Sequence, residues 1–200
     1  MTVIEISGSQ QPELTFRQRW SHYLVLIFSA VGLLIGFNLR ESILGASILY
    51  ANPQAGITAE YPQNWLLDEA DNSYIFRVRD IAATSFKTTI QVAARPVGPL
   101  TTPRIIFDSL TFERGQTLGY NVISEETYTL PDGTQTQAMI YSFVSSQTDP
   151  FLQAIDVVTQ GIDILFIERE QAVIVTFLSD ANTFDENLPV LEQFLRSLTF

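Results

Sequence analysis

Carboxylates are the reactive groups that the sequence brings closest together. Asp68, Glu69 and Asp71 form one cluster, and Glu125 is followed directly by Glu126. Carboxylate oxygens are ligands for Ca²⁺ in proteins, so each group is a candidate calcium site. However, neighbouring residues of a strand point to opposite faces, and the sequence contains no D-x-D-x-D-G loop. We therefore interpret both groups as solvated acidic surface and expect no metal site.

The sequence lacks the groups that most nucleophilic and metal-dependent catalysis requires. It has no cysteine, which excludes disulfides, thiolate nucleophiles, iron–sulfur clusters and thioether-bound haem. The single histidine, His22, lies in the apolar segment 20–38, so the rest of the chain cannot build a Ser-His-Asp triad or a histidine-ligated zinc site. The G-x-S-x-G motif and glycine-rich phosphate loops are absent, and nothing selects a pair of acids for glycoside hydrolysis. We expect no catalytic residues, no cofactor and no enzymatic activity.

Three aromatic residues, Tyr61, Trp65 and Tyr74, are the remaining candidates for a binding pocket. Large aromatic side chains bury much apolar area, and they occur more often in a core or at its rim than around a ligand. We therefore favour a core position for all three residues. No small-molecule substrate is identified from these residues.

Net charge excludes nucleic acid as a partner. Lys plus Arg number 11 and Asp plus Glu number 22, which gives a formal net charge of −11. The first 52 residues hold three arginines and three glutamates, so the whole excess of negative charge lies after them. Binding to phosphates needs clustered Lys and Arg, so we expect no nucleic-acid binding.

Residues 20–38 form an apolar segment in which nothing from Tyr23 to Phe37 carries a charge. A helix of this length, rising about 1.5 Å per residue, nearly crosses a hydrocarbon core of about 30 Å. Trp20 and Tyr23 are typical anchors at the membrane interface. A cleavable signal peptide is the alternative, but the preceding polar stretch is long and no clean small-x-small cleavage site follows. We favour a retained transmembrane helix in the lipid bilayer.

Small residues mark one face of this segment. Gly32 and Gly36 form a G-x-x-x-G pair, and Ser29 lies on nearly the same face. Small residues at this spacing let a second helix approach closely, although glycine is also simply common in membrane helices. Residues 42–51 are apolar but too short to span a membrane, so they extend the helix, lie along the membrane surface or cover a partner.

Charges around the segment favour one orientation. Arg17 and Arg19 precede the segment and Arg40 follows it. Because cytoplasmic flanks carry more Lys and Arg, we expect a cytoplasmic N-terminus and an extracytoplasmic, periplasmic domain on a bacterial cell membrane. The expected organisation is an N-terminal tail at 1–19, the helix at 20–38, a juxtamembrane segment and linker at 39–55, and one domain at 56–200.

The domain alternates between strand and helix patterns. Strands are expected up to Tyr61, after Trp65, and at 73–80, 86–96, 120–130, 136–146, 154–168 and 172–178. Helices are expected at 103–118, with Thr102 as N-cap, and after Thr183, where Thr183 and Glu186 have the spacing of a capping box. About six or seven strands, mostly joined by hairpins, with helices on their faces predict an α+β fold built on an antiparallel sheet.

The stretch ITAEYPQNW at 57–65 and the closing FLRSLTF at 194–200 resemble PsbP-like domains, the family of extrinsic oxygen-evolving-complex proteins. The resemblance covers roughly residues 56–200 and includes the long hairpin before the last helix. It implies an α–β–α sandwich that binds other proteins and carries no common catalytic residues. The membrane segment departs from the soluble extrinsic members, which argues against a direct photosystem role.

These patterns together predict a non-catalytic, single-pass accessory subunit of a larger membrane protein complex. An electron-transfer or photosynthetic assembly is the expected complex, with other membrane subunits as partners. The extracytoplasmic domain would stabilise or shield those subunits. A membrane-tethered ligand-binding or sensory module is the alternative.

Overall fold

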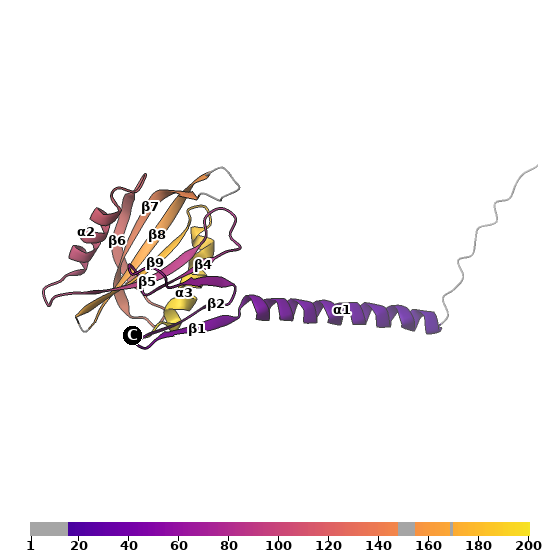
Figure 1. Cartoon of the computed structure of the whole chain (residues 1–200). Helices are drawn as coiled ribbons and strands as arrows, with labels where there is room; N and C mark the ends of the chain where they lie inside the picture. The colour runs from indigo at the N-terminus through magenta and orange to yellow at the C-terminus, as the bar shows by residue number, and fades with distance from the viewer. Residues whose placement is uncertain (1–15, 148–154, 169) are drawn as a thin grey trace, which may run out of the picture. The chain divides into compact units, whose positions relative to one another are not determined.

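The computed structural model describes residues 16–147, 155–168 and 170–200, and it contains two compact units, Met1–Ala46 and Ser47–Phe200. Figure 1 shows helix α1 (Phe16–Leu44) in the first unit and the sheet with its helices in the second. The expected N-terminal tail lies outside the described residues up to residue 15. Each unit is considered by itself below.

Helix α1 is longer than the predicted segment at both ends, running from Phe16 to Leu44. Its part from Trp20 to Arg40 has a mean hydropathy of 1.9 and is long and apolar enough to cross a membrane. No side chain of that part is buried within the chain. An apolar N-terminal helix of this kind is compatible with a membrane anchor or with a signal sequence.

The second unit is built on a seven-stranded antiparallel sheet with the order β3-β4-β5-β9-β8-β7-β6. Its strands are β3 (Trp65–Asp68), β4 (Phe76–Asp80), β5 (Thr89–Pro96), β6 (Asn121–Thr129), β7 (Gln135–Gln147), β8 (Ile155–Glu168) and β9 (Gln171–Asp180). The two predicted hairpins are confirmed as β6–β7 and β8–β9. Gly133 in the first turn has a φ of 87°, the left-handed conformation that favours glycine.

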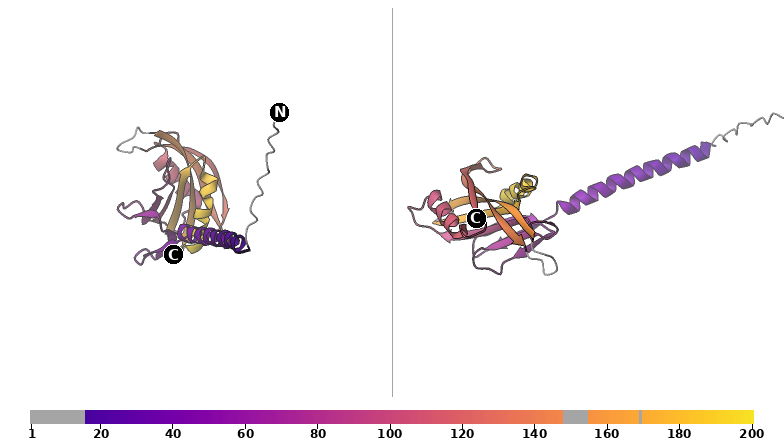
Figure 2. Two further views of the ribbon diagram at one scale, coloured as in Figure 1. Left: turned by 90° about the vertical axis from the view of Figure 1, so that its right-hand side faces the viewer. Right: turned by 90° about the horizontal axis from the view of Figure 1, so that it is seen from above.

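Helices cover opposite faces of this sheet, which confirms the predicted α+β sandwich (Figures 1 and 2). Helix α2 (Pro103–Arg114) buries Ile106, Phe107 and Leu110 against β7, β8 and β9. Helix α3 (Phe184–Ser197) buries Leu191 and Phe194 in the larger core on the other face. Strand β9 is buried almost throughout, as expected for a central strand covered on both sides.

A separate hairpin also belongs to the domain, and it changes the expected domain boundary. Strands β1 (Ser47–Asn52) and β2 (Ile57–Pro62) pair with each other, and Tyr50 packs on Phe76 with ring centroids 4.0 Å apart. Residues 47–55, expected in the juxtamembrane segment and linker, are therefore strand and turn in the second unit. The apolar residues at 48–50 form a strand because Tyr50 finds a core to bury itself in.

The helix termini differ from the predicted capping pattern. Thr102 and Thr183 are the N-cap residues, but neither side chain makes a capping hydrogen bond. Instead, the Oγ1 of Thr183 accepts a bond from the Asn187 amide at 3.3 Å. Helix α2 ends at Arg114 instead of residue 118, and Gly115 is its C-cap.

Candidate functional site

The membrane-related residues singled out in the sequence all lie on α1. Trp20, Tyr23, Ser29, Gly32 and Gly36 are exposed in the structure. A Cβ added to either glycine would meet nothing within 4 Å. These residues thus form an open helix surface with no function within the chain itself.

Among the described residues, no group of three or more His, Asp or Glu side chains is placed so that it could hold a metal ion. Two acids of the first cluster have partners within the domain. Asp68 pairs with Arg77, and Glu69 accepts a hydrogen bond from the Tyr50 hydroxyl at 2.8 Å. Glu125 and Glu126 are exposed on β6. The three aromatic candidates Tyr61, Trp65 and Tyr74 are buried, as favoured above.

A row of polar side chains crosses one face of the sheet, and it is the candidate site. The strand register places Asp68 opposite Arg77, Arg77 opposite Gln91, Gln91 opposite Thr176, and Thr176 opposite Asp163. Paired residues of neighbouring strands share a face, so these five side chains line up across β3, β4, β5, β9 and β8. We call them the polar row. They lie on the face that α2 covers only in part.

The inner end of the polar row is a buried ion pair. Asp163 is completely buried and accepts hydrogen bonds from both Nη atoms of Arg114, one of them at 3.2 Å. It also accepts bonds from the hydroxyls of Thr176 at 2.6 Å and Tyr141 at 3.4 Å. The Arg114 guanidinium lies over the Tyr141 ring, 4.6 Å from its centroid. The carboxylate is therefore paired and fully hydrogen-bonded, which is what a buried charge requires.

The pKa values of two groups around Asp163, Arg114 and Tyr141, are both raised. Burial alone would lower the pKa of Arg114, but the Asp163 carboxylate raises it above the ordinary value. Burial, followed by the negative charge of Asp163, raises the pKa of Tyr141 well above its usual range. Arg114 therefore stays charged and Tyr141 keeps its proton near neutral pH.

Gly161 makes this cluster possible. It lies opposite Tyr141 in the β7–β8 register, and a Cβ built on it would come within 2.5 Å of the tyrosine ring. Glycine is therefore needed for close approach, because any larger side chain would displace the ring from Asp163.

The outer end of the polar row carries excess positive charge. The Nη2 atoms of Arg77 and Arg79 both face the same oxygen of Asp68, at 2.6 and 3.5 Å. Hydrogen bonding from Arg77, helped by the Ala70 amide, lowers the pKa of Asp68 to about 2. The Arg77 guanidinium also lies 4.6 Å from the centroid of the Tyr74 ring. Two guanidinium groups thus share one carboxylate.

Two cavities lie along the polar row and share Gln91 and Leu178 in their walls. The inner cavity, of about 210 Å³, contains Arg114, Thr117, Tyr120 and Tyr141 in its lining. The Tyr120 hydroxyl there is buried without a hydrogen-bond partner among the described residues. The outer cavity, of about 360 Å³, is lined by Arg77, Arg79 and Lys87 with Thr89.

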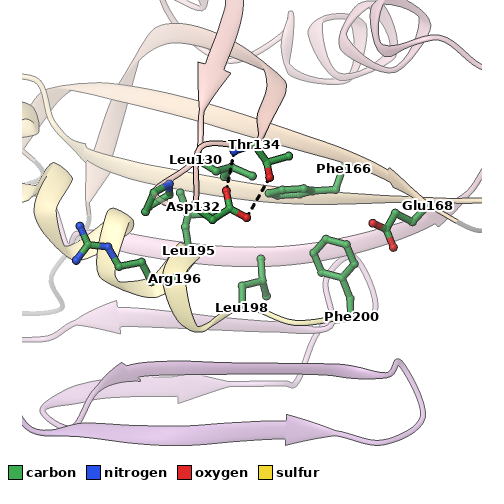
Figure 3. Close-up of a pocket in the computed structure, with 10 residues that line it drawn as sticks. Leu130, Asp132, Thr134, Phe166, Glu168, Leu195, Arg196, Leu198 and Phe200 are labelled. Carbon is green, nitrogen blue, oxygen red and sulfur yellow. Dashed lines mark hydrogen bonds between the residues drawn. The ribbon is translucent and has the colours of Figure 1, made fainter.

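A third cavity lies elsewhere on the domain, near the end of the chain (Figure 3). It has a volume of about 360 Å³ and a largely apolar wall that includes Phe166 and Phe200, whose rings meet edge to face at 5.2 Å. Asp132 points into this region, but its carboxylate already accepts two hydrogen bonds from Thr134, one from the amide at 2.8 Å and one from the hydroxyl at 3.1 Å. The rest of the wall includes the charged side chains of Glu168 and Arg196.

The polar row was not predicted from the sequence, although two signals pointed to it. Asp163 is the single charge within the apolar run GIDILFI of a strand expected to be covered on both sides. Arg77 and Arg79 alternate with buried residues and so lie on one face. Only the strand order could show that these signals lie on the same face, because β4 and β8 are separated by two other strands.

Comparison with known proteins shows the fold. No protein-family model matches the chain, and no curated protein matches it. The solution structure of cyanobacterial PsbP (CyanoP) from Synechocystis sp. PCC 6803 is similar, with a TM-score of 0.53 and 11% identity, over 77% of this chain and 92% of that one. LpqN of Mycobacterium tuberculosis, described as involved in cell envelope biogenesis, matches with a TM-score of 0.49 and 10% identity, over 77% and 88% of the two chains.

The likeness to cyanobacterial PsbP defines the class of the second unit. It is a PsbP-like α+β domain, as the sequence motifs indicated, preceded by an apolar N-terminal helix. An identity of 11% shows the common fold and nothing about a shared ligand or partner.

Proposed function

We propose that this protein is a single-pass, membrane-anchored accessory subunit of a larger membrane protein complex, without catalytic activity of its own. Its PsbP-like domain would lie on the extracytoplasmic side and stabilise or shield neighbouring subunits. The observation that carries the proposal is the wholly unburied apolar surface of α1 between Trp20 and Arg40. Such a surface needs lipid, other helices or both to cover it.

The connection between helix and domain supports this role. Only Gly45 and Ala46 separate the end of α1 from the start of β1. Two extended residues span about 7 Å, so the domain cannot reach far from the end of the helix. A tether of this length suits a domain that works on immediate neighbours in the membrane.

The polar row supports the absence of catalysis. Its buried acid Asp163 is paired with Arg114, and the neighbouring Tyr141 keeps its proton because burial raises its pKa. A general base or nucleophile needs the opposite, a pKa near the working pH. By analogy with the PsbP-like fold alone, the complex would be an electron-transfer or photosynthetic assembly, with the protein as a structural component.

Extraction and purification test the proposal together. Alkaline carbonate washing should leave the full chain in the membrane pellet, because the apolar helix remains in lipid. Purification in a mild detergent followed by mass spectrometry should then recover other membrane subunits at fixed stoichiometry. Release by carbonate, or a monomer free of partners, would contradict it.

The small-residue face of α1 offers a matched pair of variants. Gly32→Leu with Gly36→Leu should weaken retention in the complex, because bulky side chains hold neighbouring helices apart. Nothing within 4 Å in the chain obstructs these changes, so the fold should tolerate them. Ala30→Leu adds bulk on another face of the same helix and serves as the control. Co-purification of the double variant at the wild-type ratio would show that this face is not the contact.

A membrane-tethered ligand-binding module is the second candidate. It is favoured by the cationic outer cavity, which a purely structural domain does not need. A clean monomer that retains a small molecule through purification would favour this second candidate.

A further inference from the structure

Positive charge is more concentrated around the outer cavity than in the rest of the domain. Only eight basic residues follow residue 52, and three of them, Arg77, Arg79 and Lys87, line this cavity. One acid, Asp68, forms ion pairs with two of these cations, Arg77 and Arg79. In a chain of net charge −11, this concentration of cations is the opposite of the average surface.

The cations are not satisfied by their neighbours. Lys87 has no carboxylate within 4.0 Å among the described residues, and its ammonium donates only a long bond of 3.4 Å to the Ile81 carbonyl. The Nε atoms of Arg77 and Arg79 are buried and have no hydrogen-bond partner in the described part of the chain. Each guanidinium meets Asp68 through one Nη2 atom, and the other donors remain available for a ligand.

The Arg77 side chain is held in place, and the arginines remain accessible. Arg77 is fixed by Asp68 and by the Tyr74 ring, and the backbone of Lys87 is held by a hydrogen bond of 2.7 Å from the Thr89 hydroxyl to the Lys87 carbonyl. The Arg77 and Arg79 side chains are 29% and 36% exposed, so solvent reaches them. Pre-positioned donors with access to solvent are what an anion site requires.

We propose that the outer cavity binds an oxyanion, a phosphate or carboxylate group, through Arg79, Lys87 and the free donors of Arg77. Guanidinium forks match the geometry of both groups, and the third cation supplies a point charge. An added anion would also relieve the repulsion between two arginines that share one carboxylate oxygen. Phe86 and Leu178 complete the wall and offer apolar contact beside the charge.

The oxyanion has two possible sources, a free small anion or the acidic side chain of a protein neighbour. Both sources would present an oxyanion to the same cations, and two probes distinguish them. Inorganic phosphate represents the free anion, and a blocked tetraglutamate peptide represents an acidic segment. The inference concerns the domain surface and does not depend on the proposed membrane complex.

The test uses the full chain in non-ionic detergent at constant ionic strength. Each probe is titrated while binding is followed by calorimetry and by the shift in unfolding temperature, because a ligand of the folded state stabilises it. At least one probe should bind saturably. In the variant Arg79→Gln with Lys87→Gln, its affinity should fall by about tenfold or more, since two charge-assisted contacts are lost.

The matched control is Arg104→Gln with Arg196→Gln, which removes the same charge outside the outer cavity. It should bind as the wild type does, because Arg104 is 84% exposed on α2 and Arg196 lines the third cavity. Binding of phosphate alone would assign a free anion, and binding of the peptide alone would assign an acidic neighbour. Absence of saturable binding by both probes, or equal losses in the control and cavity variants, would overturn the proposal. If the cavity variant unfolds, Lys87→Gln alone, at a half-buried residue, provides the same comparison.

Discussion

Individual residues of the polar row have different energetic roles. Asp163 is buried and accepts hydrogen bonds from both Nη atoms of Arg114 and from two hydroxyls, whereas Arg104 and Asp108 form an exposed pair at 4.0 Å. A buried charge without its partner is costly, while an exposed pair contributes little. The two pairs therefore provide a direct comparison within one molecule.

Replacing Asp163 with Asn should destabilise the domain by about 3–5 kcal/mol, because Arg114 would be left buried without its counter-charge. Chemical unfolding of the full chain in detergent measures the change. Asp108→Asn is the control and should change the free energy of unfolding by less than about 1 kcal/mol. Equal effects of the two substitutions would show that the buried pair does not hold the sheet face together.

Asp68 should make the stability of the domain depend on pH in the acid range. Its pKa falls from 3.8 to about 2 on folding, chiefly because of the hydrogen bond from Arg77. A carboxyl with a lowered pKa binds fewer protons in the folded state, so its stabilisation is complete above about pH 4 and is lost as the pH falls through about 2.

The measurement is the free energy of unfolding as a function of pH for the wild type, Asp68→Asn and Arg77→Gln. The difference between wild type and Asp68→Asn should shrink as the pH falls from about 4 to about 2. Arg77→Gln should flatten the same part of the wild-type curve, because the main cause of the low pKa is removed. A difference that stays constant over this range would exclude the assigned pKa.

At the scale of elements, the β1–β2 hairpin is the part whose role differs most from expectation. Its Tyr50 is buried against Phe76 and hydrogen-bonds Glu69 from a strand that precedes the expected domain start. Thr58 also exchanges backbone hydrogen bonds of 2.9 Å with Thr199 near the end of the chain. The hairpin thus links the beginning and the end of the domain.

A chain starting at Ser47 should therefore fold cooperatively, and one starting at Gly56 should be less stable by about 3 kcal/mol or more. The shorter chain loses the buried Tyr50 side chain, and removal of a large aromatic group from a core costs about this much. Thermal unfolding of the two chains makes the comparison. Tyr50→Ala in the longer chain should reproduce most of the loss; identical stabilities would return the boundary to residue 56.

At the scale of the whole molecule, the proposed membrane orientation rests on few charges. Arg17 and Arg19 precede the apolar segment and Arg40 follows it, while the acidic domain contributes little to topology. In a single-pass protein, a small excess of positive charge on one flank is enough to set the membrane orientation. Such an excess is also easy to change by substitution.

Protease added to spheroplasts should remove the domain after about residue 47 and spare the membrane segment. Arg17→Gln with Arg19→Gln should reduce the fraction of cleaved molecules, because the positive excess on the cytoplasmic side is lost. Lysed cells provide the control for intrinsic sensitivity to the protease. A domain protected in intact spheroplasts and cleaved only after lysis would reverse the orientation.

The sequence by itself determined the elements whose signals are local. Hydrophobic periodicity and turn chemistry predicted three kinds of element: the apolar run around Gly32, the Pro-Asp-Gly turn at 131–133 and the long strands β6–β9. The short motifs added the resemblance to the PsbP-like fold. Tertiary structure decided what depends on distant neighbours. Residues 48–50 became a strand because Tyr50 found Phe76, and Asp163, Thr176, Gln91 and Arg77 became one site because strand order placed them side by side. Local sequence carries no information about that order, since it is set by which apolar faces bury one another.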